Sequence, residues 1–201
     1  MDLVDATIVV VAAPAIVRDL GATPAQLQWV LAAYTLALGS GLITGGRIGD
    51  DYGHRRVLLG SLAAFAVASA LCALAPTAPL LIGARVLQGL AAGLMVPQTL
   101  GIIRSSFDAA GQAKAFGAFG ATQSLAAVVG PLLGGFLVVA NLGGLGWRTI
   151  FWVNLPVAAL ALLIGLRVLP QSRQPQTTRL DAVGAALAAA SVVLVLLPIV
   201  Q

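Results

Sequence analysis

Two charged side chains, Asp5 and Arg85, lie within apolar stretches of the sequence and are the residues best placed to do chemistry there. An ionised side chain at the middle of a bilayer costs about 2.5–3.5 kcal/mol on insertion scales, so such a residue usually faces a cavity or a partner. Burial away from water favours the protonated form of a carboxyl, which makes Asp5 a candidate proton-binding site. Two alternatives stay open: Asp5 could lie at a water-exposed helix end, and Arg85 could extend to the membrane interface.

Uncharged polar residues complete the candidate site, and nothing in the sequence indicates an enzyme. Thr7, Gln88 and Gln123 are candidates to line a cavity between helices. The chain has one His and no Glu, so it offers no constellation of metal-binding side chains and no Ser–His pair within an apolar segment. We expect no catalytic residue, no metal and no cofactor. The single cysteine, Cys72, cannot form an intrachain disulfide and is expected to be a buried thiol.

The elements that position these residues must be membrane-spanning helices. The chain is 59% hydrophobic and 9% charged, whereas a soluble domain carries about 25% charged residues. The basic residues are scattered, which argues against binding to nucleic acid. Open strands are excluded because lipid offers no partner for unpaired backbone groups. We expect an all-α polytopic membrane protein, in contact with the lipid bilayer, with apolar segments at 2–17, 29–48, 57–75, 80–103, 113–138, 148–168 and 181–200.

The distribution of basic residues predicts how these helices are oriented. A cytoplasmic N-terminus places eight of them inside and two outside, in agreement with the positive-inside rule. Six helices over residues 1–169 would form one bundle, a polar cytoplasmic linker would cover 170–180, and a seventh helix would occupy 181–201. Both ends of the chain look cut, so we expect a truncated portion of a longer protein.

A charged, glycine-marked turn separates the second and third segments, over residues 46–56. Glycine permits the positive φ of a tight turn at Gly53, and Gly46 and Gly49 are expected to allow close helix packing. Asp50 can face the positive end of a helix, and basic residues hold such a turn at the anionic inner leaflet. A plain positive-inside loop is the alternative. The series Gly46, Ile48, Gly49, Asp50, Gly53, Arg55 and Arg56 resembles the loop between helices 2 and 3 of major facilitator superfamily transporters, which latches their two halves together on the cytoplasmic side.

Five further segments resemble the same family, in the same order along the chain. Residues 5–14 are similar to the first helix of its fourteen-helix drug-exporter branch, with Val10 in place of an Asn and Ala13 in place of a Leu. Arg85, Gln88 and Gly89 match a fourth-helix motif associated with proton coupling. Residues 146–156 and 180–184 resemble the starts of its sixth and seventh helices. The set Gly130, Pro131, Gly134 and Gly135 is similar to the motif of drug:proton antiporters, at which the fifth helix is expected to bend.

The resemblance implies two inverted three-helix repeats, the first half of a facilitator-type transporter. It implies export of small hydrophobic or amphipathic compounds in exchange for protons, with Asp5 and Arg85 in proton coupling, in the plasma (inner) membrane. The partners would be a small-molecule substrate, the proton and the missing C-terminal half. Two alternatives stay open: a metabolite importer of the same family, and a truncated membrane fragment that does not transport. Substrate identity, oligomeric state and the choice between proton and sodium are not determined by the sequence.

Overall fold

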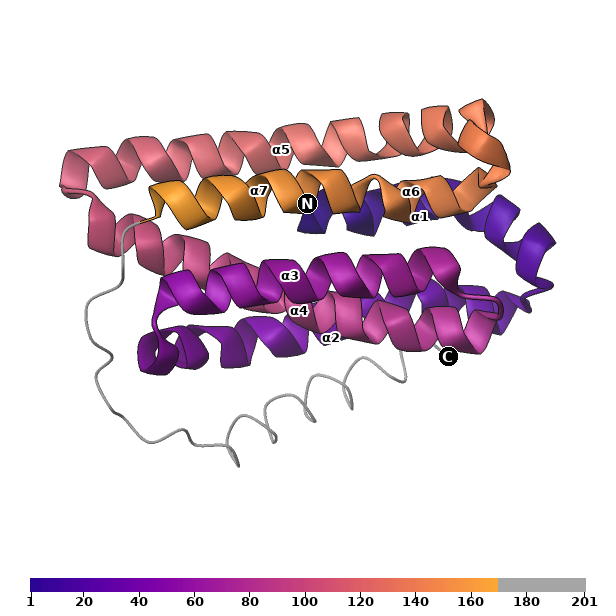
Figure 1. Ribbon diagram of the computed structural model, residues 1–201, viewed down its shortest axis with the longest axis horizontal. Coiled ribbons are helices and arrows are strands. Elements are labelled where there is room, and N and C mark those ends of the chain that lie inside the picture. The colour runs from indigo at the N-terminus through magenta and orange to yellow at the C-terminus, as the bar shows by residue number, and fades with distance from the viewer. Residues whose placement is uncertain (170–201) are drawn as a thin grey trace.

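The computed structural model describes residues 1–169, and every regular element in that part of the chain is helical. The predicted linker 170–180 and seventh helix 181–201 lie outside the described residues. Long helices lie side by side along one common direction (Figure 1). In chain order the elements are α1 (Asp2–Leu20), α2 (Pro24–Tyr52), α3 (His54–Leu74), α4 (Ala78–Ser106), α5 (Ala109–Ala140), two 3-10 turns η1 (Leu142–Gly144) and η2 (Gly146–Arg148), α6 (Thr149–Trp152) and α7 (Asn154–Val168).

The predicted all-helical membrane architecture is confirmed for this part of the chain. Five segments are long and apolar enough to cross a membrane: α2, α3, α4, α5 and the combined segment Gly146–Val168. Helix α1 is shorter, at 19 residues, and carries more charge, from Asp2, Asp5, Arg18 and Asp19. Helices α1 to α5 each coincide with one predicted apolar segment and extend beyond it at one end or both, because their caps lie in the polar connectors. At the start of α2, for example, the Thr23 hydroxyl accepts from the Gln26 amide nitrogen at 3.2 Å in a capping box.

The sixth predicted segment, 148–168, is divided in the structure. Helix α6 ends at Trp152, and α7 begins at Asn154 after one intervening residue, Val153. Pro156 explains the irregularity, because proline has no N–H to bond the carbonyl four residues before it and its ring presses against that carbonyl. Val153 keeps right-handed helical angles, so α6 and α7 run on in nearly the same direction (Figure 1).

Glycines bring two pairs of helices into backbone contact. A Cβ added to Gly41 of α2 would lie 2.8 Å from the Leu90 carbonyl oxygen of α4, and one added to Gly134 of α5 would lie 3.0 Å from the Ile8 carbonyl oxygen of α1. Small residues of this kind permit close packing in membranes, where burial of apolar surface supplies little force. The contacts of α2 with α4 and of α1 with α5 are the two pairs that inverted three-helix repeats would exchange.

Apolar side chains cover the outside of the bundle, and a row of polar side chains lies within it. Large residues such as Leu132, Phe136 and Val139 are exposed on α5, as a surface facing lipid tails requires. Within residues 1–169, buried polar residues on six of the helices are the exception to this apolar interior, and the charged ones among them are Asp5 and Arg85.

Candidate functional site

An ion pair between Asp5 of α1 and Arg85 of α4 lies inside the bundle. The Arg85 Nη1 atom donates to Asp5 Oδ2, and the two side chains are 0% and 1% exposed. The alternative in which Arg85 extends to the membrane interface is therefore wrong, as is the one that places Asp5 at a water-exposed helix end. Pairing is what makes this burial tolerable, because an isolated charge would lose its hydration without compensation.

Two side-chain amides add hydrogen bonds to the same carboxylate. Gln88 Nε2 and Asn154 Nδ2 donate to Asp5 Oδ1 at 2.9 and 2.7 Å. The Gln88 Oε1 atom in turn accepts from Arg85 Nη1 at 2.9 Å. Hydrogen bonds to an ionised acceptor are about twice as strong as those between neutral groups, so this arrangement of donors is complementary to a carboxylate. Gln88, expected to line a cavity, is fully buried between the two charges.

Aromatic rings and one carbonyl hold the guanidinium of Arg85 from its other sides. The central carbon of the guanidinium lies 4.0 Å from the centroid of the Tyr34 ring and 5.9 Å from that of Phe151. Its Nε atom donates to the Val30 carbonyl at 3.3 Å. The negative face of an aromatic ring attracts a cation, and the attraction is strongest where water is excluded. The positive charge is thus held by contacts that do not depend on Asp5.

A second layer of hydrogen bonds links this pair to α3. Ser69 Oγ accepts from Asn154 Nδ2 at 3.0 Å and donates to the Phe151 carbonyl at 2.9 Å. The buried thiol of Cys72 lies 3.4 Å from Gln88 Oε1, which confirms its expected burial. Sequence reasoning missed Ser69, Tyr34 and Asn154; the available signal was the presence of single polar groups within apolar segments.

The other candidate residues on α1 and α5 lie outside this network. The Thr7 hydroxyl donates within its own helix to the Leu3 carbonyl at 3.0 Å and packs directly against Gly130. Gln123 Nε2 lies 3.5 Å from Asp2 Oδ2, nearer the start of α1. Gly134 packs against Ile8 of α1, whereas a Cβ on Gly135 would meet only Val11 Cγ1, at 3.8 Å. Pro131 lies within α5, which continues as a helix on both sides of it.

The charged turn is shorter than predicted. The sequence indicated a loop over 46–56, but α2 continues to Tyr52 and α3 begins at His54, so the chain reverses at one residue. Gly53 makes this reversal with a φ of 88°, which confirms the predicted positive φ. The expected close packing is correct for Gly49 and, within residues 1–169, wrong for Gly46, since no atom of another helix in that part of the chain lies within 4 Å of its added Cβ position.

Contacts between α2, α3 and α4 hold this turn in place. Gln98 of α4 donates to the Gly45 carbonyl at 2.6 Å and is joined to His54 Nδ1 at 2.8 Å through its Oε1 atom. Asp50, although largely exposed, lies 3.4 Å from His54 Nε2. The predicted gate residues Arg55 and Arg56 follow on α3, and Arg55 Nη2 donates to the Leu166 carbonyl of α7 at 2.8 Å. The buried Gln98 was not identified from the sequence.

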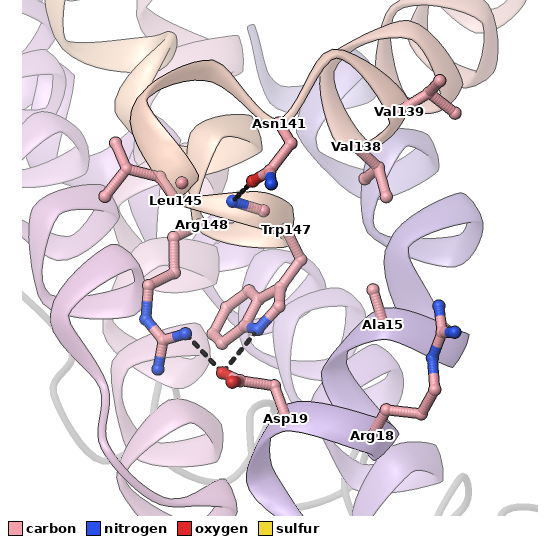
Figure 2. A pocket seen from close by; sticks show the side chains of 11 residues that line it. Ala15, Arg18, Asp19, Val138, Val139, Asn141, Leu145, Trp147 and Arg148 are labelled. Atoms are coloured by element: carbon pink, nitrogen blue, oxygen red, sulfur yellow. Dashed lines mark hydrogen bonds and ion pairs between the residues drawn. The ribbon is translucent and has the colours of Figure 1, made fainter.

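A second charged cluster closes the opposite end of the bundle, beyond the apolar segment of α1 (Figure 2). Asp19 accepts hydrogen bonds from Arg148 and, at 2.9 Å, from Trp147 Nε1. These bonds, chiefly the one from Arg148, hold the pKa of Asp19 below its ordinary value. An open cavity of about 530 Å³ lies beside them, lined also by Arg18 and Asn141. The cluster ties the end of α1 to the connection between α5 and α6.

The fold and this site define a helical membrane protein whose interior holds a buried, hydrogen-bonded ion pair. A family model described as the Major Facilitator Superfamily matches residues 1–200. The chain belongs to this superfamily, as its motifs indicated, and thus to a family of membrane transporters rather than to a family of enzymes. Within residues 1–169 no group of three metal-binding side chains occurs.

Curated relatives extend well beyond the part that this chain matches. It is 43% identical over 201 residues to a probable actinorhodin transporter of Streptomyces coelicolor, covering 100% of this chain and 35% of the relative. It is 40% identical over 173 residues to the tetracenomycin C resistance and export protein of Streptomyces glaucescens, covering 86% and 31%. The multidrug efflux pump LfrA of Mycolicibacterium smegmatis is 36% identical over 181 residues, covering 90% and 35%. The chain therefore spans about a third of the length of these relatives.

Solved structures agree on the fold. The inward-open xylose transporter XylE from E. coli superimposes with a TM-score of 0.68 at 17% identity, covering 95% of this chain and 53% of that one. The human organic anion transporter MFSD10 gives a TM-score of 0.69 at 20% identity, covering 93% and 50%. The chain thus has the fold of about half of a facilitator.

Proposed function

We propose that this chain forms the N-terminal bundle of a secondary transporter that exports small hydrophobic or amphipathic compounds in exchange for protons. The observation that carries the proposal is the Asp5 carboxylate, buried and paired with Arg85 between α1 and α4. A proton on Asp5 removes the negative charge from this contact and so changes the free energy of packing between the two helices. The printed names of the relatives, which include antibiotic and multidrug exporters, support export as the direction.

The exchange follows from competition between two access states. Substrate and proton would each favour one state, so a proton gradient shifts the population towards the state that releases substrate outside. The protein would lie in the plasma membrane with its N-terminus in the cytoplasm. The charged turn would then close the cytoplasmic side of the transporter; its residues are Gly46, Asp50, Gly53, Arg55 and Arg56. Its contacts from Gly45 through Gln98 to His54 support a role in holding three helices together.

Several other assignments belong to this proposal. Residues 1–169 would be the first six-helix bundle, 170–180 the linker and 181–201 the next helix, with a second half contributed by the remainder of a longer protein. The coverage of about a third of each relative supports this. Thr7, Gln88 and Gln123 would line the path between the halves when the transporter opens. The set Gly130, Pro131, Gly134 and Gly135 would let α5 bend against α1, which the close α1–α5 approach favours.

Transport by the full-length protein in liposomes tests the role of Asp5. Ethidium, a lipophilic cation, is followed by its fluorescence on DNA trapped inside vesicles, with an imposed pH gradient of either sign. We expect Asp5→Asn to abolish gradient-driven ethidium movement and to leave its passive equilibration through the protein unchanged. Asp2→Asn, on the same helix but outside the network, is the matched control and is expected to keep the coupling.

Stability must be separated from coupling in this experiment. Asp5→Asn leaves the Arg85 charge buried without its partner, a change that costs about 3–5 kcal/mol in comparable pairs. The double variant Asp5→Asn/Arg85→Gln removes both charges and should regain stability without regaining coupling. Normal gradient-driven transport by a folded Asp5→Asn protein would overturn the assignment.

A further inference from the structure

A single amide side chain, that of Asn154, bonds both the carboxylate of Asp5 and the hydroxyl of Ser69. Its Nδ2 atom carries two hydrogens, and the two distances of 2.7 and 3.0 Å use both of them. Asn154 is 5% exposed and is the first residue of α7, directly after the break that follows α6. The amide therefore joins the carboxylate on α1 to the discontinuity in the sixth span.

The hydrogen bonds of Asp5 suit only its ionised form. Three donor groups point at its two oxygens: Arg85 Nη1, Gln88 Nε2 and Asn154 Nδ2. A carboxylic acid carries an O–H that must itself donate, so protonation at Oδ1 places a hydrogen opposite a hydrogen. One neighbour must then present an acceptor. Arg85 has none, and Gln88 Oε1 already accepts from Arg85 and from Cys72.

Asn154 can present that acceptor by rotating its amide about half a turn. We propose that Asn154 is a positioning residue that transmits the protonation of Asp5 to the α6–α7 break through this rotation; the inference rests on the proposed role of Asp5 as the proton site. After rotation, Asn154 Oδ1 faces both the new Asp5 O–H and the Ser69 hydroxyl. The proton stays on Asp5, and no other covalent bond changes.

The rotation has a consequence for the backbone next to the break. Ser69 has one hydroxyl hydrogen, which it now donates to the Phe151 carbonyl at 2.9 Å. With Nδ2 of Asn154 replaced by an oxygen, that hydrogen turns towards Asn154 and releases the Phe151 carbonyl. This carbonyl lies in the last turn of α6, where Pro156 already weakens the helix. Proton binding on α1 would thereby loosen the sixth span.

Few other titrating or charged groups face Asp5. Arg85 of α4 pairs with it, while Tyr34 of α2 and Cys72 of α3 lie close enough to interact with its charge. The amide of Asn154 carries no net charge in either orientation, so its effect on the proton equilibrium comes from hydrogen bonding alone. A change in the proton equilibrium of Asp5 on substitution of Asn154 therefore reports the loss of hydrogen bonding rather than a change in net charge.

Infrared difference spectra of the full-length protein, recorded between pH 5 and pH 9, test the inference without any transport substrate. The carboxyl band of protonated Asp5 is identified by its loss in Asp5→Asn. We expect Asn154→Leu to move the midpoint of this band to higher pH by about one unit, because the carboxylate loses a charge-assisted hydrogen bond while the protonated acid loses only a weaker neutral one. A side-chain amide band should titrate with the same midpoint in the unmodified protein and be absent in Asn154→Leu.

Two further variants keep the result interpretable. Thr149→Val is the matched control, since the Thr149 hydroxyl is buried in α6 without a hydrogen bond among the described residues and its removal should not move the midpoint. Ser69→Ala leaves the Asp5 contacts intact and is expected to shift the midpoint upward by less than one unit; it serves if Asn154→Leu fails to fold. An unchanged midpoint in both variants, or an amide band that does not titrate, would overturn the inference. Absence of any Asp5 band in the unmodified protein would instead overturn the proposed function.

Discussion

Replacing Gly134 by Ala should push α5 away from α1, whereas the same change at the adjacent Gly135 should not. A Cβ on Gly134 would lie 2.7 Å from Ile8 Cγ1 and 3.0 Å from the Ile8 carbonyl oxygen. Carbon atoms in contact prefer about 3.5–4.0 Å, so the Ile8 side chain must move and the two backbones must separate by a few tenths of an ångström. At Gly135 the nearest atom, Val11 Cγ1, is 3.8 Å away, which is an ordinary contact.

Both variants change the intrinsic helix propensity by the same amount, so the difference between their stabilities reports the packing contact alone. Gly→Ala within a helix gains up to about 1 kcal/mol at either position. Overpacking of a close contact costs about 1–3 kcal/mol, and only Gly134→Ala incurs it. The free energy of unfolding in detergent, measured by SDS titration of the full-length protein, should therefore be lower for Gly134→Ala than for Gly135→Ala by about 1–3 kcal/mol. Equal stabilities, or a lower value for Gly135→Ala, would refute the close packing of α5 on α1.

Two further expectations concern the ring that holds Arg85 and the cluster at the far end of the bundle. Tyr34→Leu removes a cation–π contact worth about 2 kcal/mol where water is excluded, and Tyr34→Phe keeps it. Thermal unfolding should therefore show a larger loss of stability for Tyr34→Leu, and equal losses of stability in the two variants would contradict the contact. Because the pKa of Asp19 is lowered in the folded protein, the bonds to Arg148 and Trp147 should persist above the unfolded value of about 4 and be lost as pH falls through the lower folded value. Trp147 fluorescence should report that acid transition and lose it in Asp19→Asn.

The positions of the helices could be predicted because each span requires about 20 apolar residues in sequence, a local property. Asp5 and Arg85 could be singled out for a related reason: a charge in an apolar run is costly and therefore conspicuous. Their pairing with each other depends on the packing of α1 against α4, two helices far apart in the chain. The family resemblance implied that both residues face a common cavity, but it did not predict that they contact each other.

Residues whose role depends on neighbours were harder to find. Asn154 and Ser69 are single uncharged polar groups, which membrane helices tolerate at many positions, and only tertiary structure brings them to Asp5. The charged turn was expected to be a loop because its composition is polar. Charged residues at a membrane boundary are equally compatible with helix, and the positive φ of Gly53 alone reverses the chain.

The buried ion pair also imposes an order of events during synthesis. Asp5 leaves the ribosome 80 residues before Arg85 and 149 before Asn154. At about 5–20 residues per second, the first helix waits about 4–16 s for its counter-ion. A bare carboxylate is unfavourable in lipid throughout that interval, and protonation relieves the penalty. The first helix must therefore enter the membrane before the contact that neutralises Asp5 exists, and the ion pair can form only when the fourth helix arrives.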